Sequence, residues 1–151
     1  MVFPPDFRWE DVVRIDKSLG KRVSFLGATF TGDAYFGRAR FSEGAYFRDA
    51  VFSMDADFWG ATFSGSTYFW KVTFSGGADF THATFGGDTN FWGVTFQSWL
   101  SFRGATFPQD GGPGVVSIMV TLEKPERVDF QNVNLFSRLL FGYEPPSGPL
   151  R

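Results

Sequence analysis

The chain has 151 residues, no Cys and a formal net charge of −2, from 14 Lys and Arg against 16 Asp and Glu. The lack of Cys excludes a disulfide framework and a thiolate metal site, and the balanced charge argues against direct nucleic-acid binding. Hydrophobic residues make up 43% of the chain, which excludes disorder, but 21 Phe against two Ile is not the aliphatic mixture of an ordinary core.

Residues 1–22 are expected to cap the domain that follows. Within them, residues 6–19 predict a short amphipathic helix with Asp6 as its N-cap, Trp9 in its buried stripe and Gly20 as its stop. The segment has acidic residues early and no apolar core, so it does not resemble a signal peptide. No apolar run reaches the roughly 20 residues that span a bilayer. We therefore expect a cytoplasmic protein without a membrane span.

Residues 23–107 carry one repeated pattern centred on Phe. The spacing between successive Phe alternates between five and six residues, which gives an 11-residue unit. A small or aliphatic residue precedes each Phe by two positions, a mostly polar residue lies between them, and Ser, Gly and Asp follow. The sixteen repeated residues are Phe25, Phe30, Phe36, Phe41, Phe47, Phe52, Phe58, Phe63, Phe69, Phe74, Phe80, Phe85, Phe91, Phe96, Phe102 and Phe107. Sixteen matches without a slip indicate a repeat architecture.

Each unit predicts a strand of three residues followed by a turn. The small residue and the Phe are two positions apart, so in an extended segment both face one side, and the two neighbours of the Phe face the other. A strand this short must pair with its equivalent in another repeat. The pattern therefore predicts a solenoid with Phe inside and polar residues outside.

A coil of this solenoid must hold a whole number of 11-residue units, because equivalent positions of the repeat must stack on one another in successive coils. One unit makes too tight a loop for a column of Phe rings, whereas two units give 22 residues, four strands and an approximately square section. The four faces begin with Phe25, Phe30, Phe36 and Phe41, and rings one coil apart should be separated by about 4.8 Å. The prediction is an all-β parallel β-helix of about four coils.

The repeats resemble the pentapeptide-repeat family, whose members carry tandem A-[D/N]-[L/F]-[S/T]-x units. The segments Ala56-Asp57-Phe58, Ala78-Asp79-Phe80 and Ala61-Thr62-Phe63-Ser64-Gly65 match this unit closely. Phe replaces the common central Leu almost throughout, and every second unit carries one extra residue, as in an 11-residue variant. The resemblance implies a right-handed quadrilateral β-helix. It also implies a role that some members have, which mimic DNA and protect type II topoisomerases from inhibitors.

Residues 108–151 begin with a break in the repeat, at a loop rich in Gly and Pro over residues 108–114. Residues 115–122 predict a strand, and residues 128–135 return to the repeat pattern, so part of a further coil is expected. An apolar cluster between Leu135 and Tyr143 is either a cap or a dimer contact. The Pro-rich tail after it is expected to be mobile.

No combination of residues in the chain predicts catalysis. His82 is the sole His and falls at a predicted corner, so it has no Cys or second His with which to form a transition-metal site. Asp33, Asp55, Asp57 and Asp79 fall near one edge of the prism, where paired carboxylates could serve acid–base chemistry or bind calcium. Asp is also a normal corner residue, and no water-excluding cleft is evident. We expect no enzyme, no cofactor and no metal.

The outward positions of the first face carry four large aromatic residues. Tyr46, Tyr68, Trp70 and Trp92 form a candidate binding patch, because exposed aromatic patches mark interaction sites. The alternative is that the C-terminal segment folds back and covers them.

Two functions from different classes follow. The first is a non-enzymatic scaffold that binds an unknown protein partner, or a second copy of the chain, through the aromatic face or the C-terminal segment. The second is a DNA-mimic modulator of a type II topoisomerase. Residues 23–107 hold seven acidic and five basic residues, so such a mimic would be short and weakly charged.

Overall fold

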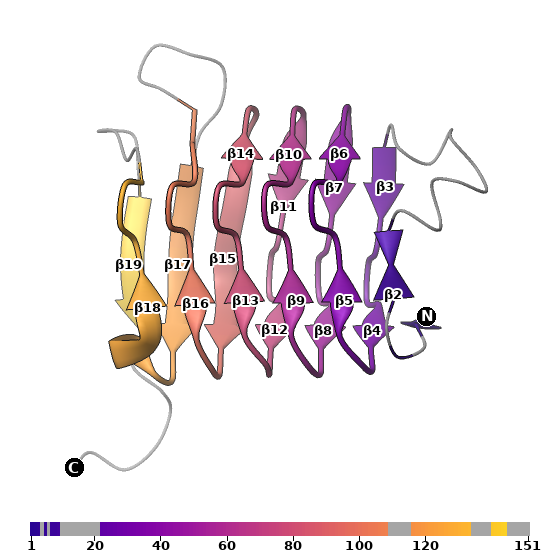
Figure 1. Ribbon diagram of the computed structural model, residues 1–151, viewed down its shortest axis with the longest axis horizontal. Helices are drawn as coiled ribbons and strands as arrows, with labels where there is room; N and C mark the ends of the chain where they lie inside the picture. Colours follow the sequence, from indigo (N-terminus) through magenta and orange to yellow (C-terminus); the bar gives the residue numbers. More distant parts are fainter. Residues whose placement is uncertain (4, 6, 10–21, 109–115, 134–139, 145–151) are drawn as a thin grey trace.

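The computed structural model describes residues 1–3, 5, 7–9, 22–108, 116–133 and 140–144. In this part of the chain, short strands wind into an all-β parallel solenoid of about four turns with three parallel sheets (Figure 1). Within the repeat, each strand pairs with the strand 22 residues away, as Thr62 with Arg40 and Ala78 with Ala56. The all-β class and the 22-residue coil are therefore confirmed.

The ten-stranded sheet contains the first and second faces of the coil. Its strands are β1 (Val2–Phe3), β3 (Arg22–Ser24), β4 (Thr29–Phe30), β7 (Gly44–Tyr46), β8 (Val51–Phe52), β11 (Ser66–Tyr68), β12 (Thr73–Phe74), β15 (Thr89–Phe96), β17 (Val116–Leu122) and β19 (Leu140–Glu144).

The third and fourth faces form the two smaller sheets. The third face comprises β2 (Phe7–Arg8), β5 (Ala34–Tyr35), β9 (Ala56–Asp57), β13 (Ala78–Asp79), β16 (Leu100–Ser101) and β18 (Val128–Asp129), with a 3-10 helix (Pro125–Arg127) before β18. The fourth face comprises β6 (Arg40–Phe41), β10 (Thr62–Phe63) and β14 (Thr84–Phe85), extended by a bridge from Thr84 to Thr106.

The expectation of four separate faces is corrected to three sheets, because β15 runs through a corner without a break. In the earlier coils the first and second faces are separate strands, but β15 covers both and pairs with β11, β12 and β17. Gly93 adopts a φ of 71° inside β15, and the register with β17 shifts between Trp92 and Val94. This bulge absorbs the corner residue and joins two faces into one sheet.

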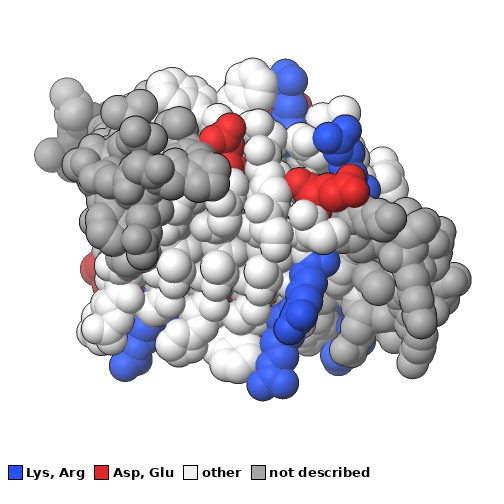
Figure 2. Space-filling view, turned by 90° about the horizontal axis from the view of Figure 1, so that it is seen from above, with Lys and Arg blue, Asp and Glu red and all other residues white. Residues whose placement is uncertain are grey.

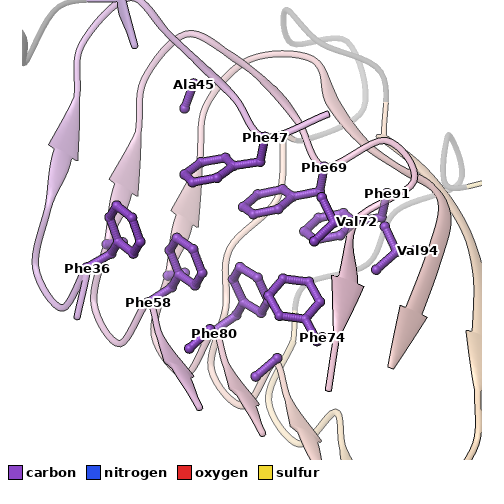
Figure 3. Packing of buried hydrophobic residues seen from close by; sticks show 14 of the residues in the cluster. Phe36, Ala45, Phe47, Phe58, Phe69, Val72, Phe74, Phe80, Phe91 and Val94 are labelled. Atoms are coloured by element: carbon purple, nitrogen blue, oxygen red, sulfur yellow. The ribbon is translucent and has the colours of Figure 1, made fainter. Parts of the chain in front are cut away.

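The core consists of four columns of stacked Phe rings. All sixteen repeated Phe are at most 4% exposed. Rings one coil apart lie 4.6–5.1 Å between centroids with interplanar angles of 1–19°. Some rings of different columns meet edge to face, as Phe47 and Phe58 do at 5.6 Å and 87° (Figure 3), and others are tilted, as Phe47 and Phe52 are at 40°. The predicted inward position of the Phe, and its spacing, are confirmed.

The corners that follow the first and third faces are built on residues with positive φ. The residue two positions after each Phe of these faces has φ between 57° and 71°, whether it is Gly60 or a larger residue such as Arg38 or His82. Its N–H donates to the next coil, as from Gly60 to the Thr81 carbonyl at 2.8 Å, and the following N–H returns to the Phe carbonyl at 2.9–3.2 Å. The corner therefore closes each strand and projects its side chain outward.

The N-terminal end is covered by strands where the sequence analysis predicted a helix over residues 6–19. Residues 6 and 10–19 lie outside the described residues, but Phe7 and Arg8 form β2, which pairs with β5, and no helical cap is seen in the described part. Phe3 stacks on Phe30 at 4.8 Å and 9°, and Trp9 lies 5.3 Å from Phe41. The prediction was wrong because these residues add a layer to the Phe columns at a spacing that breaks the 22-residue period.

The C-terminal segment adds strands to the solenoid, as expected for residues 115–122 and 128–130. β17 pairs with β15, β18 pairs with β16, and Phe130 stacks on Phe102 at 5.6 Å and 12°. The apolar cluster after residue 133 lies outside the described residues, except for the backbone of β19, which pairs with β17. No helix of the described chain is long and apolar enough to cross a membrane.

We expect Phe58→Ala to lower the free energy of unfolding by about 3–5 kcal/mol, because it removes a buried ring and leaves a cavity between Phe36 and Phe80, which lie 4.8 and 4.9 Å away. The matched control is Trp59→Ala in the same repeat. Trp59 is 39% exposed, so its loss should cost about 0.5 kcal/mol. Urea denaturation followed by circular dichroism measures both, and equal losses would contradict the assignment of inner and outer positions.

Candidate functional site

The four predicted aromatic residues lie together on the outer side of the first face, and we call Tyr46, Tyr68, Trp70 and Trp92 the aromatic strip. Tyr46 and Tyr68 are register partners on β7 and β11, and their rings stack at 5.3 Å and 11°. Trp70 follows β11 and Trp92 lies one coil further in β15, where its carbonyl accepts a hydrogen bond from the N–H of Lys71 at 2.9 Å. The coil brings together residues up to 46 positions apart in the sequence.

Cationic side chains lie over the rings of the aromatic strip. The Arg48 guanidinium carbon is 4.1 Å from the centroid of Trp70, and the Lys71 ammonium is 5.4 Å from the same ring. Arg22 lies 6.0 Å from the centroid of Tyr46. Contacts of this kind contribute about 0.5–1 kcal/mol at exposed sites. They place cationic groups directly beside aromatic rings on this face.

The aromatic strip is partly open to solvent. Trp92 is 46% exposed, whereas the other three aromatic residues are half-buried. Leu26, which lies beside Arg48 on the same face, is 59% exposed. The Nε1 atom of Trp70 is buried and has no hydrogen-bond partner in the described part of the chain. β17 and β19 continue the sheet beside the aromatic strip, with Met119 as register partner of Trp92. These two strands therefore extend the face and do not fold over it.

The acidic residues singled out in the sequence hold the backbone of the third face. Oδ1 of Asp57 accepts a hydrogen bond from the N–H of Trp59 at 2.8 Å, and Asp79 does the same for Thr81 at 2.9 Å. Asn90 fills the equivalent position on the first face and accepts from Trp92 at 2.8 Å. An Asx turn of this type explains a short polar acceptor before the Phe without any catalytic role.

Asp33 and Asp55 form a second set of backbone contacts, which runs along the solenoid axis. Asp33 Oδ1 accepts from the N–H of Asp55 at 3.1 Å, and Asp55 Oδ1 accepts from the N–H of Gly77 at 2.7 Å. These carboxylates, with Asp57 and Asp79, line an open hollow of about 200 Å³ that Tyr35 and Trp99 complete. The sequence analysis placed all four acidic residues at one edge, and the structure brings them there.

The pKa of Asp57 is raised above its ordinary value of 3.8. Burial of the carboxyl group is the main cause, the hydrogen bond from Trp59 opposes it, and the negative charge of Asp79 adds to it. A raised pKa means that the charged form is less stable in the folded protein than in the unfolded chain. The Asp57 carboxylate therefore costs stability near neutral pH.

The structure adds one exposed aromatic residue that the sequence analysis did not select. Trp59 lies on the outer side of the third face, with Arg38 5.0 Å from its ring and His82 6.4 Å away in an edge-to-face arrangement. The signal was available, since the residue after Phe58 faces outward in the repeat. His82 is exposed at its corner, and the described residues contain no group of three His, Cys, Asp or Glu that could hold a metal ion.

We expect Asp57→Asn to stabilise the protein in a pH-dependent way. Asn can accept the hydrogen bond from Trp59, as Asn90 does from Trp92, but it carries no charge. Below about pH 3 the wild-type carboxyl is protonated in both the folded and the unfolded state, so the two proteins should be equally stable. As the pH rises through 3.8 and past the raised pKa, the wild type should become less stable than the variant, by a small margin because the site is partly exposed.

Urea unfolding at several pH values between about 3 and 7 measures this difference. Asp49→Asn is the control, because it removes a carboxylate that is exposed and pairs with Arg48 at 3.4 Å. A stability difference that stays constant over the whole pH range would contradict the assigned cause.

Comparison with known proteins agrees with the repeat and the solenoid. A family model described as pentapeptide repeats (9 copies) matches residues 25–73 and 60–106, which together span more than half of the chain. No curated protein and no solved structure gives a match. The matched residues contain both the Phe columns and the aromatic strip. The chain belongs to the pentapeptide-repeat family, as a Phe-rich variant.

Proposed function

We propose that this protein is a non-enzymatic scaffold, wound as a right-handed four-sided coil, that binds a partner protein through the aromatic strip. The single observation that carries the proposal is the row of Arg48, Trp70 and Trp92 on one face, with the Arg48 guanidinium over the Trp70 ring and Trp92 46% exposed. Trp and Arg are the residues that most often dominate the energy of protein interfaces.

The buried Nε1 of Trp70 supports the same proposal. An indole N–H that is buried without an acceptor loses the hydrogen bond it makes to water, and buried Trp usually finds a partner for this group. A carbonyl or carboxylate of a bound partner would supply the missing acceptor once the side chains that cover Nε1 move aside. Arg48 and Lys71 beside the ring would then favour a partner with acidic groups.

Self-association through the C-terminal segment belongs to the same proposal. β19 pairs with β17 on one side, and no described strand pairs with its other side. An open sheet edge can bind a strand of another chain, including a second copy.

The test of the aromatic strip compares two exposed Trp on different faces. Trp92→Ala should weaken partner capture from the native host at least about tenfold, because a hot-spot Trp contributes ~2 kcal/mol or more. Trp59→Ala removes the same side chain from the third face and should leave this capture unchanged. Trp70→Phe keeps the ring but removes Nε1, so it should weaken binding if the partner accepts that hydrogen bond. Equal retention of partners by Trp92→Ala and the wild type would exclude the aromatic strip.

A second candidate function is modulation of a type II topoisomerase by DNA mimicry. The observation that favours it is the row of Asp33, Asp55, Asp57 and Asp79 along one edge of the coil. A supercoiling assay at micromolar protein tests it, with the Asp57→Asn/Asp79→Asn variant as comparison. Inhibition that this variant loses would favour mimicry, and no effect of the wild type would exclude it.

A further inference from the structure

The third face separates positive from negative charge between its two edges. In the coils of residues 31–107, the side before the Phe of this face comprises the corner and strand residues 31–35, 53–57, 75–79 and 97–101. These contain four Asp and no Lys, Arg or His, and we call this side the acidic edge. The corner after the strands comprises residues 37–39, 59–61, 81–83 and 103–105. These contain Arg38, Arg103 and His82 but no Asp or Glu, and we call this side the basic edge.

The two edges run side by side along β5, β9, β13 and β16, and Arg8 on β2 adds a cationic group at the N-terminal end of the acidic edge, 4.4 Å from the centroid of the Tyr35 ring. Register pairs set one row of Tyr35, Asp57 and Asp79 on β5, β9 and β13, and these strands lie next to one another on the side of the solenoid that faces the reader in Figure 1. In Figure 2, which looks down on the top of that view, Lys and Arg side chains project along the lower margin, the side of the third face. Asp55 and Trp59 are four residues apart, roughly 13 Å at strand spacing, whereas Asp57 and Trp59 are two residues apart, roughly 7 Å.

Each edge also carries one aromatic feature. The basic edge presents Trp59, which is 39% exposed between Arg38 and His82. The acidic edge presents the hollow of about 200 Å³, which is lined by Asp57, Trp99 and the other Asp residues. Trp59 on the basic edge and the hollow on the acidic edge therefore lie at about the same position along the solenoid axis, on sides of opposite charge.

We propose that the third face is a self-complementary surface through which two copies of this chain associate. This inference goes beyond the proposed function, because it uses neither the aromatic strip nor the C-terminal strands. The two copies face each other with the acidic edge of one against the basic edge of the other, so Trp59 of each copy lies opposite the hollow of the second. Such an interface is isologous, and both charge contacts occur twice.

The charge pattern also selects the symmetry axis of this dimer. A two-fold axis parallel to the solenoid axis exchanges the two edges while coils of the same level stay opposite each other, so every Asp row meets an Arg row. A two-fold axis along the strands would place acidic edge on acidic edge and basic on basic, which is repulsive. The two solenoids therefore lie parallel in the complex.

The size of the face sets the expected strength. Four strands at about 4.8 Å and four residues of width give on the order of 250 Å² per copy. Stable interfaces bury more than about 1,000 Å² in total, so this dimer is expected to be weak. Its attraction is largely between exposed charges, and salt should therefore weaken it strongly.

Sedimentation equilibrium over a concentration series tests the proposal. At about 20 mM salt the wild type should shift from monomer towards dimer, and about 500 mM salt should raise the dissociation constant at least about tenfold. Arg38→Glu/Arg103→Glu reverses the basic edge and should remain monomeric at low salt. Asp57→Asn/Asp79→Asn removes charge from the acidic edge but can keep both Asx turns, and it should dimerise at least about tenfold more weakly.

Mixing the two variants separates charge complementarity from a loss of folding. The Asp57→Asn/Asp79→Asn protein retains its basic edge, and the Arg38→Glu/Arg103→Glu protein retains its acidic edge, so the mixture should form a heterodimer more tightly than the Arg38→Glu/Arg103→Glu protein forms a homodimer. Arg48→Glu/Lys71→Glu makes the same change of charge on the first face and should dimerise like the wild type. Circular dichroism confirms the fold of each variant.

Three outcomes would overturn the proposal. These are a wild type that stays monomeric at low salt, a mixture that forms no heterodimer, and a dimer that Arg48→Glu/Lys71→Glu abolishes. The last would assign self-association to the first face, and would leave the proposed function standing.

Discussion

The stacking of Phe on Phe at the distance between neighbouring strands is the interaction on which the rest of the structure depends. Parallel strands are separated by about 4.8 Å, and the ring centroids of one column lie 4.6–5.1 Å apart. One spacing therefore satisfies the backbone hydrogen bonds and the ring contacts at once. Because a slip by one residue would turn every Phe outward, the columns fix the register of all four faces.

The outer surface takes its order from the same register. Each outward position repeats every 22 residues, so side chains of one kind form rows along the solenoid, as Tyr46 and Tyr68 do. Some rows have a structural role, and the Asx turns of Asp57 and Asp79 explain why carboxylates recur before the Phe. Other rows leave groups unsatisfied or exposed, and Trp70 and Trp92 are the main examples on the first face. The candidate functional residues are therefore the outward side chains that make no hydrogen bond to the backbone.

The charge of this protein illustrates how a balanced composition can conceal an ordered surface. The net charge of −2 argues against a large single-sign field, and that remains true of the whole molecule. The coil nevertheless collects Asp on one edge of the third face and Arg on the other. Burial is the main cause of the raised pKa of Asp57 on the acidic edge, and the negative charge of neighbouring Asp79 adds to it. A surface of this kind favours a complementary partner at short range, and salt weakens the contact because the charges are exposed.

The sequence by itself determined the solenoid, the inner position of the sixteen Phe and the outer position of the aromatic strip, because the alternation of five and six residues specifies which side chains share a face. It also contained the signal for Trp59. Only the tertiary structure decided how the ends of the solenoid are covered. Phe3 stacks on Phe30, which is 27 and not 22 residues away in the sequence, so the 22-residue period does not predict this first layer. The merging of two faces through β15 depends likewise on how Gly93 and β17 pair. These features arise from contacts between segments that the repeat does not relate, and such contacts leave no periodic pattern in the sequence.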